Sequence, residues 1–142
     1  MSIGFIGAGK VGQSLAIYFK SKSVSVSGFY GRHYEQTRMA VEQSFKVFPS
    51  LIELVENADV IGITVNDDQI ESVIEDLLSL GLNLEDKYIF HTSGAHDVIA
   101  LKQIKAHTFG FHPLKAFSKV ITTASELDEI YFSLEGADAC TD

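Results

Sequence analysis

Three glycines near the N-terminus have the spacing of a loop that holds a phosphate group. Gly7-x-Gly9-x-x-Gly12 follows the apolar run Ser2–Ile6 and leads into the amphipathic run Val11–Lys20. Gly7 permits a tight turn, Gly9 lets a pyrophosphate approach the backbone, and Gly12 lets a helix pack closely on a strand. The helix N-terminus adds free N–H groups and the positive end of its dipole. The pattern predicts a dinucleotide site, and the alternative is a purely structural turn.

The end of the second apolar run distinguishes one dinucleotide from another. Domains selective for NAD carry Asp or Glu about 20 residues further on, where the carboxylate binds the ribose 2′-hydroxyl. Residues 28–33 contain no acid, whereas Arg32 can bind a 2′-phosphate through two parallel hydrogen bonds, and His33 can add another. We therefore predict NADP, the alternative being a solvated loop arginine. The missing acid also argues against a methyltransferase, whose own cofactor carries a ribose diol.

Candidate groups for a reaction follow the later apolar runs. Ligands of a doubly wound sheet bind beyond the C-terminal ends of its strands. Four stretches should therefore converge: residues 7–12, 64–68, 91–95 and 112–115. Pro113 restricts His112 to extended backbone, and an imidazole there could polarise a carbonyl group or relay a proton. A structural histidine fits the sequence equally well.

Hydroxyl and carboxyl groups stand at the same predicted edge. The stretch His91-Thr92-Ser93-Gly94 could supply hydroxyl or N–H groups to a nicotinamide and a substrate, or it could be a capped turn between a strand and a helix. Asp67 and Asp68 invite an acid–base role, but Asp at a helix start is more often an N-cap. We take His112 and Ser93 as the candidate catalytic residues.

The predicted cofactor-binding residues form four short segments. They are Gly7, Ala8, Gly9, Lys10, Val11 and Gly12; Gly31, Arg32 and His33; Thr64, Val65 and Asn66; and Thr92. The Thr64–Asn66 loop is expected beside the nicotinamide ribose. No metal site is predicted, because one cysteine and scattered histidines give no ligand spacing.

Apolar and amphipathic runs alternate along the chain and predict the elements that position these residues. Strands are expected at Ser2–Ile6, Val24–Tyr30, Lys46–Phe48, Val60–Val65, Tyr88–His91, Thr108–His112 and, as an edge strand, Tyr131–Leu134. Helices are expected at Val11–Lys20, Tyr34–Gln43, after a Ser50 cap with Glu53 in the capping box, at Asp67–Leu80 and at Asp97–Lys105. This rhythm predicts an α/β fold with a doubly wound parallel sheet, a Rossmann fold, in a single domain over residues 1–142.

Composition narrows the classes of partner and compartment. A net charge of −8 argues against a nucleic-acid surface. The one cysteine, Cys140, excludes a disulfide within the chain and fits a reducing cytoplasm. We also expect no signal peptide before Ile3 and no membrane span, since no apolar run reaches about 18 residues.

Five motifs together resemble a known family. They are Gly-Phe-Ile-Gly-Ala-Gly-Lys-Val-Gly (4–12), Gly-Arg-His (31–33), Ala-Asp-Val-Ile-Gly-Ile-Thr-Val-Asn-Asp-Asp (58–68), His-Thr-Ser-Gly-Ala (91–95) and His-Pro-Leu-Lys-Ala-Phe (112–117). The series resembles Rossmann-like oxidoreductases with a DUF2520 C-terminal domain. These are relatives of pyrroline-5-carboxylate reductase, prephenate dehydrogenase and the 6-phosphogluconate dehydrogenase superfamily.

The resemblance implies more than this chain contains. Such proteins continue past Gly136 into a mostly helical domain that dimerises and completes the substrate site, so this chain is expected to be truncated and to turn over little alone. In prephenate dehydrogenases a similar His-Pro lies at the substrate. Asn66 stands where relatives often carry proline, and Lys115-Ala116 replaces Gln-Thr, which puts fine substrate contacts in doubt.

Two functions fit these predictions. The first is an NADP-dependent oxidoreductase that acts on a small carbonyl, imine or alcohol, working as a homodimer when complete. The second is a non-catalytic module that senses NADP(H) and controls a partner. An enzyme needs proton-handling groups beside the nicotinamide, and Ser93 and His112 favour it.

Overall fold

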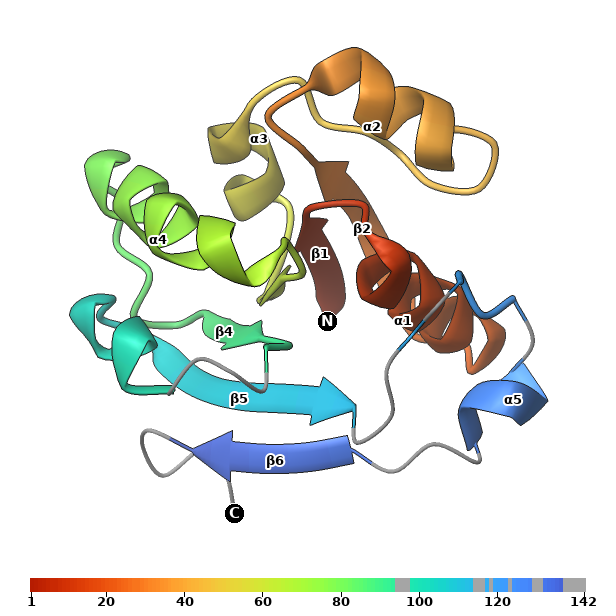
Figure 1. Cartoon of the computed structure of the whole chain (residues 1–142). Coiled ribbons are helices and arrows are strands. Elements are labelled where there is room, and N and C mark those ends of the chain that lie inside the picture. The colour runs from red at the N-terminus through yellow and green to blue at the C-terminus, as the bar shows by residue number, and fades with distance from the viewer. Residues whose placement is uncertain (94–97, 114–116, 118, 123, 129–131, 137–142) are drawn as a thin grey trace.

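One six-stranded sheet organises the chain, with strands in the order β2-β1-β3-β4-β5-β6 (Figure 1). The computed structural model describes residues 1–93, 98–113, 117, 119–122, 124–128 and 132–136. The strands are β1 (Ser2–Ile6), β2 (Ser25–Tyr30), β3 (Val60–Ile63), β4 (Tyr88–His91), β5 (His107–Pro113) and β6 (Phe132–Gly136). The first five strands in this order, β2, β1, β3, β4 and β5, pair in parallel, and β6 pairs antiparallel to β5. The predicted doubly wound parallel sheet is confirmed, with an antiparallel strand at its edge.

Helices cover both faces of this sheet. They are α1 (Lys10–Ser21), α2 (Tyr34–Val41), α3 (Leu51–Glu56), η1 (Asp67–Gln69), α4 (Ile70–Ser79), η2 (Val98–Gln103) and α5 (Ala124–Asp128). Apolar residues of α3, α4 and η2 share one buried cluster with Ile61, Ile63 and Ile89 of the strands. Residues of α1 and α5 share the other cluster with Phe5 and Phe90. Alternate residues of β1, β3 and β4 thus enter opposite cores, as a sheet covered on both faces requires.

The chain reverses its direction across the sheet after β2. It passes to β2 on one side of β1 and then to β3 on the other, so both flank β1. Such a switch point leaves a crevice beyond the C-terminal ends of the strands, where ligands of this architecture bind. The loop that follows β1 is therefore placed at the crevice by topology alone.

Three predicted elements differ in the structure. Lys46–Phe48 is not a strand, since only Val47 bridges to Phe29 on the far side of β2 and Pro49 follows directly. The helix expected at Asp97–Lys105 is a short 3₁₀ helix, η2, and Asp97 lies outside the described residues. Asp67–Leu80 begins as a 3₁₀ turn before α4.

Hydrogen bonds of single side chains fix the limits of two other elements. Ser50 caps α3 as predicted, because its hydroxyl accepts a hydrogen bond from the N–H of Glu53 at 3.3 Å. Strand β3 ends at Ile63, two residues before its predicted end, because Thr64 turns toward the loop after β1.

A polar tether joins α1 to the segment that follows β5. The Ser14 hydroxyl donates to the carbonyl of Lys10 at 2.6 Å and accepts from the N–H of Ile121 at 2.7 Å. The Tyr18 hydroxyl donates to Asp128 Oδ1 at 2.7 Å, and this bond raises the pKa of Tyr18. Ile121 and Leu127 then pack into the core under α1. The tether holds residues 121 and 128, which are distant in the sequence, beside α1, the helix that begins at the crevice.

Candidate cofactor-binding site

The glycine loop is held in shape by Thr64. The Thr64 hydroxyl donates to the carbonyl of Gly7 at 2.7 Å, and the Thr64 N–H donates to the carbonyl of Ile6 at 2.9 Å. Gly7 has φ of 99°, a left-handed value that favours glycine, and a Cβ there would lie 2.6 Å from Val65 Cγ1. A Cβ on Gly12 would collide with Thr64 Oγ1 and lie 2.8 Å from the Gly7 carbonyl. These two glycines serve close packing, as their spacing predicts.

Gly9 differs from Gly7 and Gly12, because a side chain built on it would enter open space. The nearest atom to a Cβ built there is the Thr64 carbonyl oxygen at 3.5 Å, an ordinary contact. Gly9 is also the N-cap of α1, where no side chain caps the helix and no acidic residue stands in the first turn. Uncapped N–H groups beside an open glycine suit a pyrophosphate, so the residues present fit a dinucleotide.

A narrow pocket lies on the β2 side of this loop. Its volume is about 130 Å³. Apolar side chains of β1, α3 and α4, together with polar groups at the end of β2, line it: Ile6, Gly7, Ala8, Tyr30, Gly31, Arg32, His33, Gln36, Thr37, Leu51, Val65, Gln69, Val73 and Asp76. We call it the adenosine pocket, because the end of the second strand is where this fold meets the ribose of a dinucleotide.

Arg32 reaches across the adenosine pocket to α4. Its Nη2 donates to Asp76 Oδ2 at 2.7 Å and to the Ser72 hydroxyl. Gly31 is required beside it, since a Cβ there would collide with the Thr37 hydroxyl, which itself donates to the His33 carbonyl at 3.1 Å. The structure thus places Gly31, Arg32 and His33 together at one pocket. Sequence reasoning missed Ser72 and Asp76, which only the crossover of the chain brings to Arg32.

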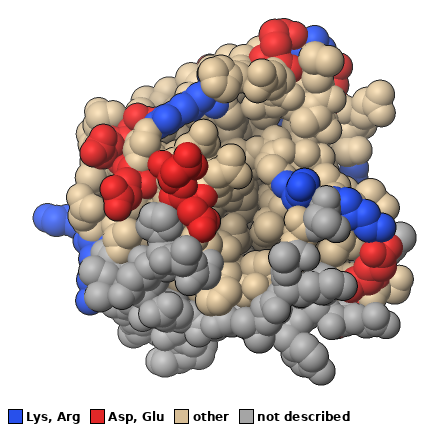
Figure 2. Space-filling view, in the orientation of Figure 1, with Lys and Arg blue, Asp and Glu red and all other residues tan. Residues whose placement is uncertain are grey.

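A wider cavity lies on the other side of the glycine loop, with a volume of about 720 Å³. Its described lining residues are Gly9, Lys10, Val11, Thr64, Val65, Asn66, Asp67, Asp68, Thr92 and Phe117. Figure 2 shows the hollow between acidic side chains over α4 and basic side chains over α1. The four predicted cofactor-binding segments contribute to the two cavities. Phe117 ends the motif His-Pro-Leu-Lys-Ala-Phe (112–117) but was missed as a site residue, because an aromatic side chain fits a core as well as a cavity wall.

The two aspartates of the wide cavity do not cap a helix. The 3₁₀ turn begins at Asp67, so Asn66 takes the N-cap position, without a side-chain cap hydrogen bond. The expectation that Asp67 or Asp68 is the N-cap is therefore wrong. Both lie in the first turn of η1, exposed at the edge of the cavity.

Ser93 and His112 lie at the ends of β4 and β5, as their sequence positions predict. Ser93 is buried, and its N–H donates to Nδ1 of the buried His91 at 3.3 Å. His112 is half-buried and faces Ser133 of β6 in the sheet register. Among described residues the wide cavity is lined by Thr92 and not by Ser93 or His112. Gly94, Ala95, Lys115 and Ala116 lie outside the described residues, so the catalytic roles stay predictions.

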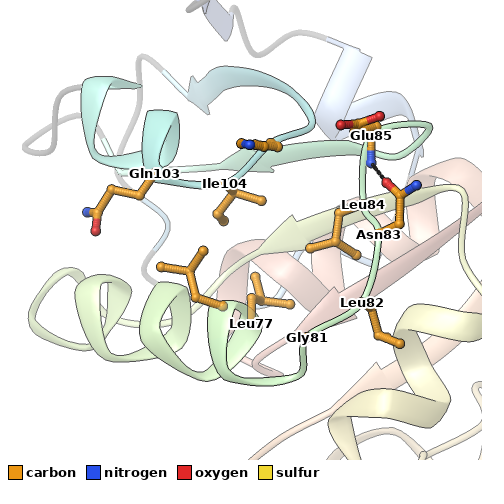
Figure 3. Close-up of a pocket in the computed structure, with 10 residues that line it drawn as sticks. Leu77, Gly81, Leu82, Asn83, Leu84, Glu85, Gln103 and Ile104 are labelled. Atoms are coloured by element: carbon orange, nitrogen blue, oxygen red, sulfur yellow. Dashed lines mark hydrogen bonds between the residues drawn. The ribbon is translucent and has the colours of Figure 1, made fainter.

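A third hollow lies at the opposite edge of the sheet (Figure 3). It has a volume of about 440 Å³ and lies between the end of α4 and η2, lined by Leu77, Gly81, Leu82, Leu84 and Ile104 among others. Asn83 there accepts a hydrogen bond from the N–H of Glu85 at 2.9 Å. Its residues precede β4 and β5, so it lies far from the crevice where a dinucleotide would bind.

The described residues show no feature of two other kinds of site. None of their His, Cys, Asp and Glu side chains gather in threes that could hold a metal ion. Within the same residues, no helix has both the length and the apolar character needed to cross a bilayer.

Comparison with solved structures agrees with this architecture. A protein of Bacteroides fragilis assigned as an NADP oxidoreductase shares 21% identity at a TM-score of 0.80, over 96% of this chain and 52% of that one. An imine reductase of Bacillus cereus shares 18% identity at a TM-score of 0.64, over 81% and 41%. A reductive aminase of Aspergillus terreus, solved with NADPH and ethyl levulinate, shares 14% at 0.63, over 81% and 41%. The chain thus spans about half the length of the first of these proteins.

The family comparison goes beyond the fold. No curated protein matches the chain significantly in sequence. Residues 2–116, however, match the family described as the NAD binding domain of 6-phosphogluconate dehydrogenase. This confirms the predicted superfamily and a nicotinamide dinucleotide as the cofactor, while the narrower resemblance to proteins with a DUF2520 domain stays a prediction. The chain belongs to the family of 6-phosphogluconate dehydrogenase NAD-binding domains.

Proposed function

We propose that this chain is the NADP(H)-binding domain of an oxidoreductase that acts on a small carbonyl, imine or alcohol. The observation that carries the choice of NADP is Arg32, whose guanidinium lies in the adenosine pocket where NAD-selective domains place a carboxylate. Asp76 lines the same pocket but belongs to α4 and holds Arg32. The first solved structure above is assigned as an NADP oxidoreductase, and the reductive aminase was solved with NADPH.

The proposed roles follow the cavities. The uncapped start of α1 binds the pyrophosphate, with Thr64 fixing the loop that presents it. Arg32 and His33 bind the 2′-phosphate in the adenosine pocket. Val65, Asn66 and Thr92 line the wide cavity, which suits the nicotinamide half. The bound cofactor supplies hydride chemistry, whereas the protein supplies binding and orientation.

The proton-handling groups of this proposal are His112 and Ser93. Ser93 follows β4 and His112 lies near the end of β5, and both strands end at the same edge of the sheet as the glycine loop. In the proposed enzyme His112 donates or accepts a proton at the reacting oxygen or nitrogen of the substrate, and Ser93 orients that atom through a hydrogen bond. A sensor of NADP(H) would need neither group.

We further propose that a second, mostly helical domain completes the substrate site and forms a homodimer in the cytoplasm. The support is that this chain covers 52% of the Bacteroides fragilis protein and 41% of the imine reductase. A site shared between two domains also explains why the wide cavity of this chain is open. The substrate is then chosen largely by the other domain.

Calorimetric titration with NADPH and NADH tests the cofactor assignment. We expect NADPH to bind more tightly by about 10–150-fold, since a hydrogen bond to a charged group is worth roughly 1.5–3 kcal/mol. Arg32→Ala should remove most of this preference and leave NADH binding nearly unchanged. Arg38→Ala is the matched control, because Arg38 of α2 pairs with Glu35 of α2 and with Glu42, the residue that follows it, and is absent from the described lining of the pocket. Equal or reversed affinities of the natural chain would contradict the proposal.

A further inference from the structure

We infer that Asp76 is a specificity-determining residue of the adenosine pocket: it occupies Arg32 and so weakens the preference for a 2′-phosphorylated cofactor. The inference rests on the proposed NADP function. Asp76 is distant from the glycine motif in the sequence, and it belongs to a helix that no motif identifies.

The contact is built by two residues of α4. Ser72 and Asp76 are one helical turn apart, so their side chains share one face of the helix. Both accept a hydrogen bond from Arg32 Nη2, the Asp76 bond at 2.7 Å. Asp76 also lines the adenosine pocket with Gly31 and His33. A 2′-phosphate bound at Arg32 would therefore lie close to a carboxylate.

The pair is weak enough to be disturbed by a ligand. The side chains of Arg32 and Asp76 are 42% and 45% exposed, and exposed ion pairs contribute little to stability. The hydrogen bonds of Arg32 to described residues both leave from Nη2, so Nη1 and Nε face no competition from them. A phosphate can thus bind while Asp76 stays, but it meets a guanidinium whose charge is already balanced.

This arrangement fixes the sign of the effect. A phosphate group carries more than one negative charge, and a carboxylate within a few ångströms repels it even where water screens the charges. The 2′-hydroxyl of NADH carries no charge and is indifferent to the same carboxylate. Asp76 therefore changes the difference in affinity between NADPH and NADH, and it has little effect on the binding of the parts that the two cofactors share.

Asp76→Asn isolates the charge. The amide oxygen of asparagine can still accept from Nη2, and Ser72 keeps its hydroxyl, so Arg32 stays across the pocket. Glu75→Gln is the matched control, because Glu75 is the neighbouring acid of α4, is exposed, and is absent from the described lining of the pocket. Both variants remove one negative charge from one helix.

The experiment titrates the natural chain, Asp76→Asn, Glu75→Gln and Arg32→Ala with NADPH, NADH and adenosine 2′,5′-bisphosphate. At about 0.15 M salt the screening length is near 8 Å, so only local charges count. We expect Asp76→Asn to tighten NADPH and the bisphosphate by roughly two- to tenfold, with NADH and the thermal midpoint unchanged. Glu75→Gln should change neither cofactor by as much as twofold.

Two results would overturn the inference. If Asp76→Asn weakens NADPH, the carboxylate positions Arg32 instead of competing with phosphate. If it tightens NADPH and NADH equally, it acts on a part that both cofactors share. Failure of the proposed function looks different: the natural chain would show no preference for NADPH, and Arg32→Ala would change neither affinity.

Discussion

The two cavities beside the glycine loop differ in size and in what encloses them. The adenosine pocket holds about 130 Å³ and is walled by β1, β2, α2, α3 and α4, which meet within one part of the fold. The wide cavity holds about 720 Å³ and gains Thr92 after β4 and Phe117 after β5. A small compartment with apolar walls and one placed cation suits a constant ligand part. A wide one leaves room for a second molecule beside the cofactor.

Charge differs between the two cavities as well. In the adenosine pocket the cation Arg32 is already paired with Asp76 and Ser72. The wide cavity is lined by Lys10 as well as by Asp67 and Asp68, and Figure 2 shows basic and acidic side chains on opposite sides of the hollow. The first cavity is thus organised before a ligand arrives. We expect variants at the ends of β4 and β5 to change catalysis and variants of the adenosine pocket to change cofactor choice.

His112→Ala should give the largest effect. In the complete two-domain enzyme that we propose, we expect turnover to fall by about 10²–10⁴-fold, the usual worth of general acid–base help. Affinity for NADPH should stay unchanged, because His112 is not among the described residues that line either cavity beside the glycine loop. Steady-state kinetics and calorimetry on the same preparation check both halves. Loss of affinity without loss of turnover would reverse the assignment.

Ser93→Ala is the companion of that test. We expect a smaller loss of turnover, since a hydroxyl there would orient the substrate rather than transfer a proton. Ser93 is buried and its N–H donates to His91, so the substitution could disturb the fold. Thermal unfolding must therefore show that the variant is folded. A larger loss than in His112→Ala would exchange the two roles.

Gly9→Ala should affect both ends of the cleft equally. The added methyl group meets no protein atom nearer than 3.5 Å, but it enters the space that we propose for the pyrophosphate. Crowding of this kind typically costs about 1–3 kcal/mol, or roughly 5–150-fold in affinity. NADPH and NADH should weaken together, while the thermal midpoint stays unchanged. Selective loss of one cofactor would place the pyrophosphate elsewhere.

Gly12→Ala supplies the contrast. Its methyl group would collide with Thr64 Oγ1 and press on the Gly7 carbonyl, so the cost falls on the folded chain itself. Thermal unfolding should show lower stability in the absence of any ligand. A variant that is stable but fails to bind would mean that the loop adapts.

The sequence predicts the parts of the site that are local in the chain. The spacing of Gly7, Gly9 and Gly12 follows from the shape of the loop that they form. Arg32 stands about 20 residues after them, where this fold places the residue that selects the dinucleotide. Asp76 lies 44 residues beyond Arg32, and only the crossover to α4 makes them neighbours. The fold divides in the same way: β1 and β4 match their predicted bounds, whereas Lys46–Phe48 is apolar enough for a strand yet finds a single bridge beyond β2. Pairing partners, unlike periodicity, are a property of the whole sheet.

Phe117 lies in the motif at residues 112–117 but was not predicted as a site residue, and it offers the most sensitive test of how the two cavities differ. The half-buried ring packs against the core beside α1 and lines the wide cavity with Gly9 and Thr92. The tether from Ser14 to Ile121 holds the same stretch of chain on α1. The ring is thus an apolar wall at the end of the cleft that we assign to nicotinamide.

Phe117→Ala should weaken NADPH slightly and leave adenosine 2′,5′-bisphosphate unchanged. Covering roughly 40 Å² of apolar surface at about 25 cal/mol per Å² is worth about 1 kcal/mol, or about fivefold in affinity. The bisphosphate lacks the nicotinamide half and therefore reports only on the adenosine pocket and its neighbours. Phe117→Leu keeps most of the apolar wall and should lose less. If both ligands weaken together, the ring supports the glycine loop rather than the nicotinamide, and the two ends of the cleft are not independent.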